Sequence, residues 1–228
     1  MTLKMHNYRQ IPAISNSDLS EFKNHIFGGP SHGRKPFKPV KAFEFGSVLH
    51  ETILEPKNEI QIPDSVDMEL INHLSKKVRD DRFCKWILQF ASKERVNLFT
   101  DPSTDLRCKS KLDLVYKNSL IVDLKTTSQP NYGAFLKSCL DYDYDRQAAF
   151  YMDSVGGKRF IFVGIQKKAP YNLFYFDASK EPNFIETGRK KYRALLRKWK
   201  EEVGTSIDFI PSTWATVETV PTLQLQAA

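Results

Sequence analysis

The segment from Leu112 to Thr127, LDLVYKNSLIVDLKTT, constrains the fold more than any other part of the chain. Its apolar and β-branched residues are typical of strands and residues 117–119 are typical of a turn, so the segment predicts a β-hairpin. Side chains alternate along a strand, so Asp123 and Lys125 point to the same face. Pairing across the hairpin is expected to bring Asp113 close to both of them.

The two carboxylates of Asp113 and Asp123 would repel each other at such a spot, and one of them would tend to hold a proton. A divalent cation removes this repulsion, and carboxylate oxygens are hard ligands that suit Mg²⁺, with Mn²⁺ as a substitute. A lysine beside the metal can orient or deprotonate a water molecule and stabilise charge that develops on a phosphate. The pattern therefore predicts a site for phosphodiester hydrolysis. A D-x-K pattern on a solvated strand face is the alternative that these residues leave open.

A helix predicted downstream offers further polar side chains. From Arg146 to Val155 the chain contains no helix breaker, and Gln147 and Tyr151 lie four residues apart on one helix face. These two side chains can hold a phosphate or the attacking water. An ordinary amphipathic helix with a half-buried Tyr151 explains the same pattern.

Two upstream features carry candidate ligands. The segment Phe43–Pro56, FEFGSVLHETILEP, predicts a helix that begins at Gly46-Ser47. His50 on this helix is either a metal ligand or phosphate contact, or a core histidine with a single hydrogen bond. The preceding stretch GGPSHGRKPFKPVK, rich in Gly, Pro and basic residues, predicts a loop. Arg34 and Lys35 in this loop can grip phosphates, and a solvated linker accounts for them equally well.

Composition limits the classes of protein to which the chain can belong. Its 228 residues can bury one good core, and 41% hydrophobic and 12% aromatic residues exclude a disordered chain. The net charge of +7 favours a polyanionic partner, although an ordinary basic enzyme also fits. Three distant cysteines without a C-x-x-C pair argue against a zinc finger or a four-cysteine iron–sulfur site, and suit a reducing cytoplasm. Neither a signal peptide nor a membrane span is expected.

The remaining pattern predicts an α/β fold, with a central mixed β-sheet flanked by helices. We expect residues 1–204 to form one domain and residues 205–228 to form a tail that packs on the core or serves in assembly. The pattern predicts helices over about 15–27, 67–79, 82–93, 131–139 and 182–203, and strands within 95–125, over 159–167 and over 172–178.

Four motifs in chain order carry a family resemblance: G-S-x-L-H, C-K-x-K-x-D, I-V-D-L-K-T-T and Y-D-Y-x-x-Q-A-A-F-Y. Together they resemble the RecE (exonuclease VIII) type of nuclease, which belongs to the PD-(D/E)xK superfamily and is related to the RecB nuclease domain. The resemblance runs from Ile14 to the strands near Phe176. It implies a restriction-endonuclease-like core and a Mg²⁺-dependent exonuclease that degrades linear double-stranded DNA from 5′ to 3′. It also implies 3′ single strands for annealing and recombination, a homo-oligomeric ring, and a phage or prophage single-strand annealing protein as partner.

The resemblance implies a role for individual residues. Asp113 and Asp123 would ligate the metal together with the Leu124 backbone carbonyl, and Lys125 would be the catalytic lysine. Relatives commonly carry arginine and proline where this chain has Ser110-Lys111, so Lys111 would supply the local charge. The other implied roles are metal ligation by His50 and, as a weaker match, by Glu94; contacts near the scissile phosphate by Gln147 and Tyr151; and DNA contacts by Thr126, Thr127 and Arg146.

Two other functions remain open at the level of sequence. One is a catalytically silent DNA-binding subunit on the same fold, against which the intact set of Asp113, Asp123 and Lys125 argues. The other is a structure-specific endonuclease. A covalently closed circle discriminates between the nucleases, because an exonuclease spares it and an endonuclease nicks it.

Overall fold

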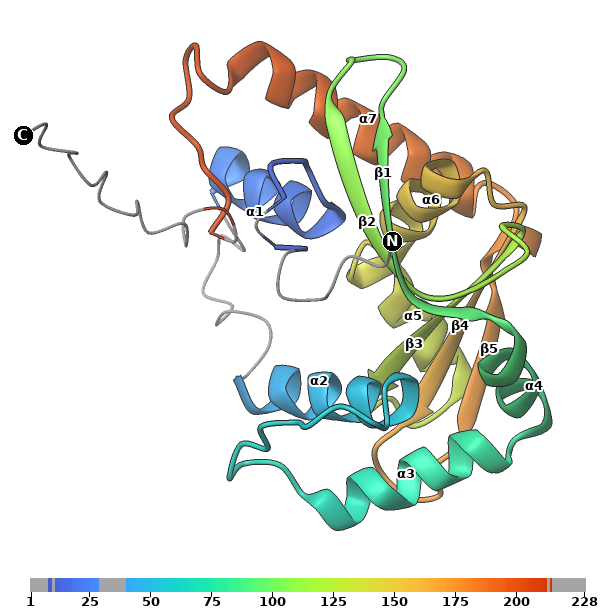
Figure 1. The fold of residues 1–228 in the computed structure, drawn as a ribbon. Helices are drawn as coiled ribbons and strands as arrows, with labels where there is room; N and C mark the ends of the chain where they lie inside the picture. Colours follow the sequence, from blue (N-terminus) through green and yellow to red (C-terminus); the bar gives the residue numbers. More distant parts are fainter. Residues whose placement is uncertain (1–7, 10, 29–39, 213, 215–228) are drawn as a thin grey trace, which may run out of the picture.

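A five-stranded sheet forms the centre of the computed structural model, which describes residues 8–9, 11–28, 40–212 and 214 (Figure 1). The strands lie in the order β1-β2-β3-β4-β5, and β3 and β4 run parallel while all other neighbours are antiparallel. The predicted mixed sheet is therefore confirmed. The strands are β1 (Ser92–Thr100), β2 (Arg107–Tyr116), β3 (Leu120–Thr127), β4 (Arg159–Gln166) and β5 (Leu173–Asp177).

Helices cover both faces of the sheet. Residues of α2, α3 and α4 pack with Leu114, Val122 and Leu124 in one core cluster, whereas α5 and α6 pack with Val115 and Ile121 in another. Helix α7 packs on α6, and α1 packs on both of them. The helices are α1 (Asn16–Phe27), α2 (Val40–Leu54), α3 (Met68–Asp80), α4 (Arg82–Phe90), α5 (Tyr132–Asp141), α6 (Tyr144–Val155) and α7 (Phe184–Glu202), with a 3₁₀ turn at Ala178–Lys180.

Strand β3 shows how the sequence determines this arrangement. Its odd-numbered residues face α5 and α6 and its even-numbered residues face α2, so both faces are buried and the strand is almost continuously apolar. Asp123 and Lys125 interrupt the apolar run on the side of α6. The parallel pairing of β3 with β4 requires a crossover, and α5 and α6 form it.

Two predicted boundaries are wrong. Helix α2 begins at Val40 rather than at Gly46-Ser47, so Gly46 lies within the helix. A Cβ atom added there would lie 3.4 Å from Thr126 Oγ1, so the glycine allows α2 to lie close against β3. Ser92 and Lys93, expected in a helix, belong to β1 because α4 ends at Phe90. The division into residues 1–204 and a tail stays a prediction, since most of the tail lies outside the described residues.

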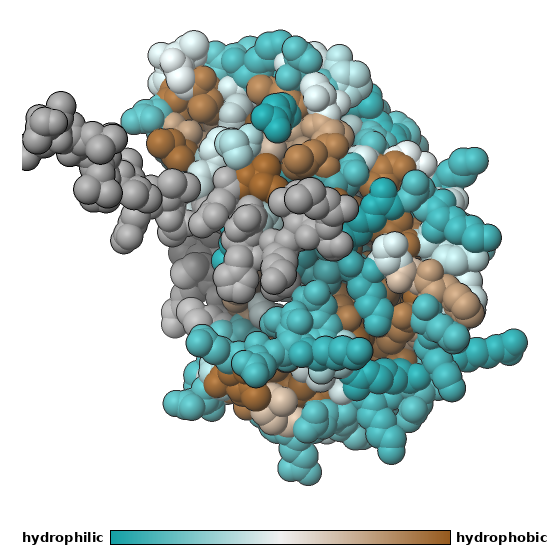
Figure 2. All heavy atoms as spheres, viewed as in Figure 1, coloured by the Kyte–Doolittle hydropathy of each residue, from teal (hydrophilic) through white to brown (hydrophobic). Residues whose placement is uncertain are grey.

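None of the helices formed by the described residues combines the length and the apolar character needed to cross a membrane. On the face shown in Figure 2, the surface between α2 and strands β1 and β2 is largely hydrophilic. Charged side chains therefore surround the region in which the predicted site lies.

Candidate active site

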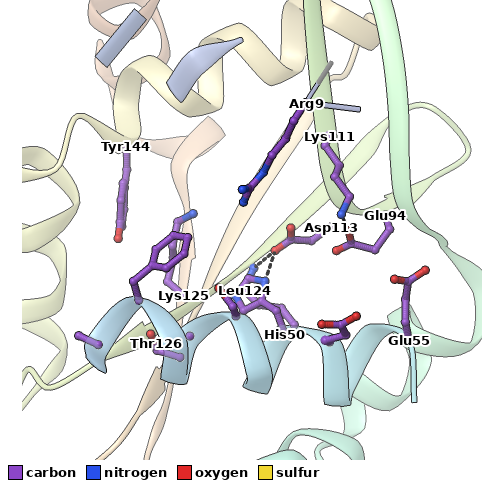
Figure 3. Close-up of a pocket in the computed structure, with 15 residues that line it drawn as sticks. Arg9, His50, Glu55, Glu94, Lys111, Asp113, Leu124, Lys125, Thr126 and Tyr144 are labelled. Atoms are coloured by element: carbon purple, nitrogen blue, oxygen red, sulfur yellow. Dashed lines mark hydrogen bonds and ion pairs between the residues drawn. The ribbon is translucent and has the colours of Figure 1, made fainter. Parts of the chain in front are cut away.

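The hairpin of β2 and β3 loses its regular backbone pairing at Asp113. The strands pair from Tyr116↔Leu120 to Leu114↔Val122. At the next position the Asp113 carboxylate takes the place of a backbone acceptor, and its Oδ2 accepts a hydrogen bond from the Leu124 N–H at 2.8 Å (Figure 3). The side chain of Asp113 is thereby tied to β3 and held at the end of the hairpin.

Glu94 lies opposite Asp113 on the other neighbouring strand. The register of β1 and β2 continues on both sides of this pair, but Glu94 itself has a φ of 50°, in the left-handed region that non-glycine residues rarely adopt. Such backbone strain is concentrated at functional sites. Here the distortion accompanies a carboxylate that lines the same pocket as Asp113.

A pocket of about 410 Å³ lies between α2, the β2–β3 hairpin and the start of α6. Figure 3 shows Arg9 and Lys111 pointing into it from one side and His50 rising from α2 on the other. The lining is strongly charged. Its ionisable residues are Arg9, His50, Glu51, Glu55, Glu94, Lys111, Asp113, Lys125 and Tyr144.

Asp123 lies beneath this pocket and is only 2% exposed. Lys125 Nζ lies 2.6 Å from its Oδ2, and Gln147 Nε2 donates a hydrogen bond to its Oδ1 at 2.8 Å. Lys125 Nζ also lies 4.8 Å from the centre of the Tyr144 ring. Helix α6 thus fixes both charged groups of the D-x-K pattern from one side.

Burial and neighbouring charges shift the pKa values of the carboxyl groups and of the lysine of the site. Burial, and after it the nearby Asp123, raises the pKa of Asp113 to about 7. Burial, and after it Asp113, also raises the pKa of Glu94. Burial by itself lowers the pKa of Lys125, but the neighbouring Asp123 outweighs this effect and raises it above its ordinary value, so the ammonium stays charged. Burial and the repulsion between neighbouring carboxylates both raise these pKa values, and a bound cation would oppose both effects.

The donors present fit a hard divalent cation. Asp113, Glu94 and the Leu124 backbone supply oxygen, and burial lowers the pKa of His50, which leaves a neutral imidazole 3.5 Å from Asp113 Oδ2. As the side chains stand, no three His, Cys, Asp or Glu groups within the described part of the chain are gathered tightly enough to hold a metal. To ligate a cation, the Asp123 carboxylate would have to bind the ion in addition to its present partners, Lys125 and Gln147.

Four of the other predicted side chains lie near this site. Lys111 forms an ion pair with Glu94, and Thr126 lines the pocket opposite Gly46. Tyr151 is partly buried and hydrogen-bonded to Gln147; burial, and after it Tyr8, Asp123 and Asp113, raises the pKa of its hydroxyl well above the ordinary value.

Two predicted DNA contacts lie apart from the pocket. Arg146 is 2% exposed, donates to Ser20 of α1 and lines a different hollow beside Lys23 and Lys191, so its DNA contact stays a prediction. Thr127 is buried, and its Oγ1 accepts a hydrogen bond from Gln129 N at 3.1 Å. Arg34 and Lys35 lie outside the described residues.

Sequence reasoning missed four ionisable residues that line the pocket, Arg9, Glu51, Glu55 and Tyr144, of which Arg9 and Tyr144 lie beside the residues predicted for catalysis. Tyr144, which lies against Lys125, belongs to the Y-D-Y-x-x-Q motif, so this motif could have indicated it as a site residue. No sequence pattern indicated Arg9, because it is a single exposed arginine before the first helix and belongs to no motif. Only the packing of distant segments brings its guanidinium over Asp113 and Lys125 (Figure 3).

Asp113→Asn is expected to stabilise the metal-free protein at pH 8. The folded protein holds a proton on Asp113 between about pH 4 and about pH 7 that the unfolded chain releases. The contribution of this group to stability is therefore lost as the pH rises through this window, and it stays lost above it. Asparagine avoids the buried charge, so we expect a gain on the order of 2 kcal/mol at pH 8 and little at pH 4.

Urea unfolding in EDTA at both pH values measures this effect. In the same experiment at pH 8, added Mg²⁺ should stabilise the unsubstituted protein more than the variant, because the variant lacks one carboxylate ligand for the cation. An equal effect of Asp113→Asn at pH 4 and pH 8 would rule out a raised pKa as the cause.

Comparisons with known proteins match the chain to one family model and to several solved structures. A family model described as a PDDEXK-like domain of unknown function (DUF3799) matches residues 23–206. No curated protein matches the chain significantly in sequence. A solved structure of a candidate exonuclease from Eubacterium rectale superposes with a TM-score of 0.60 at 16% identity, covering 89% of this chain and 88% of that one.

More distant structural likenesses are a phage-related exonuclease from Haemophilus somnus 129PT and an alkaline exonuclease from Laribacter hongkongensis. The first has a TM-score of 0.44 at 12% identity and covers 81% of this chain and 80% of its own. The second has a TM-score of 0.41 at 13% identity, and the match covers 85% of this chain and 90% of that chain.

Proposed function

Because the chain belongs to the PDDEXK-like family DUF3799, we propose that it is a metal-dependent deoxyribonuclease. Membership bears out the PD-(D/E)xK relationship and the restriction-endonuclease-like fold, whereas the narrower assignment to the RecE type stays a prediction. The observation that carries the proposal is the convergence of Asp113, Asp123 and Lys125 at one end of a hairpin, beside a pocket with cations on its rim.

We assign different roles in this chemistry to different residues of the pocket. Asp113, Asp123 and the Leu124 carbonyl would hold a divalent cation, with His50 and Glu94 as further ligands. When bound, such an ion lowers the pKa of a water molecule and neutralises charge on the leaving oxygen.

The remaining groups act on the water and the phosphate. Lys125, kept charged by Asp123, aligns the attacking water with the phosphate. Gln147 fixes the orientation of Asp123 through its 2.8 Å hydrogen bond. Arg9 and Lys111 extend from the opposite side of the pocket and meet the negative charge of the DNA backbone.

The proposed reaction is 5′→3′ degradation of linear double-stranded DNA, which leaves 3′ single strands for recombination by annealing. Support comes from the motif resemblance and from the description of the Eubacterium rectale protein as a candidate exonuclease. We further propose Mg²⁺ as the physiological ion, a homo-oligomeric ring that keeps the enzyme on its track, a single-strand annealing protein as partner, and the bacterial or phage-infected cytoplasm as the place of action.

Digestion of linear duplexes labelled at the 5′ or the 3′ end tests the reaction. With Mg²⁺ or Mn²⁺ we expect mononucleotides to be released first from the 5′ end, and no release with EDTA. A covalently closed circle should stay intact. Release from the 3′ end would reverse the proposed polarity, and nicking of the circle would indicate the endonuclease instead. Absence of metal-dependent cleavage on every substrate would contradict the nuclease assignment.

A further inference from the structure

A buried lysine holds the segment that precedes the first helix. Lys109 of β2 is 1% exposed, and its Nζ lies 3.2, 3.1 and 2.9 Å from the carbonyl oxygens of Tyr8, Arg9 and Ile11. An ammonium group has three N–H donors, so these carbonyls use all of them. The centres of the Tyr8 and Trp214 rings lie 5.2 and 5.9 Å from the same nitrogen.

This contact secures a part of the chain that the sheet does not hold. Backbone bonding to β2 begins only at Ile14, whose N–H donates to Arg107 O and whose carbonyl accepts from Lys109 N. Before Ile14, the backbone hydrogen bonds among the described residues stay within the segment itself. A buried cation is costly unless its donors are satisfied, so the ammonium and the three carbonyls depend on one another.

The fastened segment carries Arg9 over the candidate active site. Lys109, Lys111 and Asp113 alternate along β2 and therefore share one face of the strand, which runs from the ammonium to the pocket. Figure 3 shows the Arg9 side chain reaching into that pocket. Among the described residues, its guanidinium forms no hydrogen bond or ion pair that would hold it against a carboxylate of the pocket.

We propose that Lys109 is a positioning residue of the nuclease: by binding the carbonyls of residues 8, 9 and 11 it holds the Arg9 guanidinium where it meets a phosphate of the bound DNA. Lys109 itself touches neither DNA nor metal. The inference rests on the proposed function, because Arg9 needs a polyanionic substrate to bind.

A double-mutant cycle in kcat/KM tests the link between the two residues. Lys109→Met keeps an unbranched side chain only one atom shorter and removes the charge and all three donors. We expect this variant and Arg9→Ala each to lower kcat/KM about tenfold or more, mainly through KM, because one phosphate contact is lost. The kcat/KM of the double variant should be no lower than that of the less active single variant. Lys180→Met, an exposed lysine after β5, is the matched control and should leave kcat/KM unchanged. Additive losses would overturn the proposal, since they would mean that Lys109 acts independently of Arg9.

Trypsin cleavage of the peptide bond after Arg9 gives a readout that does not need nuclease activity. We expect Lys109→Met to accelerate this cleavage by tenfold or more relative to the unsubstituted protein, with the bond identified by mass spectrometry. Equal rates would overturn the anchoring role. If methionine prevents folding, Lys109→Gln, which keeps two donors, should give an intermediate rate. If the protein cuts no DNA, the proposed function fails while proteolysis still decides whether Lys109 holds the segment.

Discussion

Lys125→Met is expected to lower the rate of DNA cleavage by about 10³-fold while DNA binding is retained. Lys125 Nζ lies between the Asp123 carboxylate and the Tyr144 ring and faces the pocket, so methionine fills the same space without aligning a water molecule. The loss should appear in kcat rather than in KM, because Arg9 and Lys111 still meet the backbone of the DNA. Asp123→Ala is expected to abolish cleavage as well. Single-turnover cleavage of linear duplex with Mg²⁺, beside binding measured in Ca²⁺, separates the two effects.

The control must separate lost chemistry from lost folding. Removing Lys125 leaves Asp123 buried beside a neutral side chain, which costs stability, so Asp123→Asn combined with Lys125→Met should recover part of the loss in melting temperature without recovering cleavage. Lys117→Met is the matched lysine variant, because its Nζ lies 5.3 Å from the Tyr116 ring but outside the pocket. Full cleavage by folded Lys125→Met or Asp123→Ala protein would refute the assigned active site.

The hairpin could be predicted because the residues that determine it are close together in the sequence. Strand alternation fixes the common face of Asp123 and Lys125, and a three-residue turn fixes the strand opposite. Residues 117 and 118 adopt positive φ values, as a tight hairpin turn requires. The left-handed conformation of Glu94 was not predictable, because nothing in the pattern of β1 requires it. Its position opposite Asp113 follows from the register of two strands that are joined by a turn.

Distant packing decides the placements that the local pattern did not predict. A glycine and a serine are ordinary helix boundaries, but Gly46 lies inside α2, where a Cβ atom would come within 3.4 Å of Thr126 Oγ1 of β3. Arg146 carries a charge typical of a DNA contact, yet α1, some 126 residues earlier, covers it. Arg9 reaches the pocket only because Lys109, 100 residues further along the chain, binds its carbonyl. In each case the local pattern is ambiguous and the deciding contact is long-range.

Gly188→Ala is expected to destabilise the protein by about 3 kcal/mol or more, the largest effect on stability that we anticipate from adding one methyl group. A Cβ atom at Gly188 of α7 would lie 1.9 Å from the Asp145 carbonyl oxygen and 2.8 Å from Arg146 N. Both contacts are with backbone of α6, so no side chain can move aside and the two helices must separate. Urea unfolding monitored by circular dichroism measures the loss.

The displacement of α6 should also reach the active site. Gln147 follows directly after Asp145 and Arg146, and its amide holds Asp123, so the folded fraction of Gly188→Ala is expected to cut DNA more slowly at saturating Mg²⁺. Gly133→Ala in α5 is the matched control, since a Cβ there would meet only Asn131 Oδ1 at an ordinary 3.6 Å. This second alanine should leave stability unchanged or raise it by up to about 1 kcal/mol, because alanine favours the helix. Equal stability of the two variants would mean that α6 and α7 do not approach as closely as the structure places them, and the restraint on Asp123 through Gln147 would then need another origin.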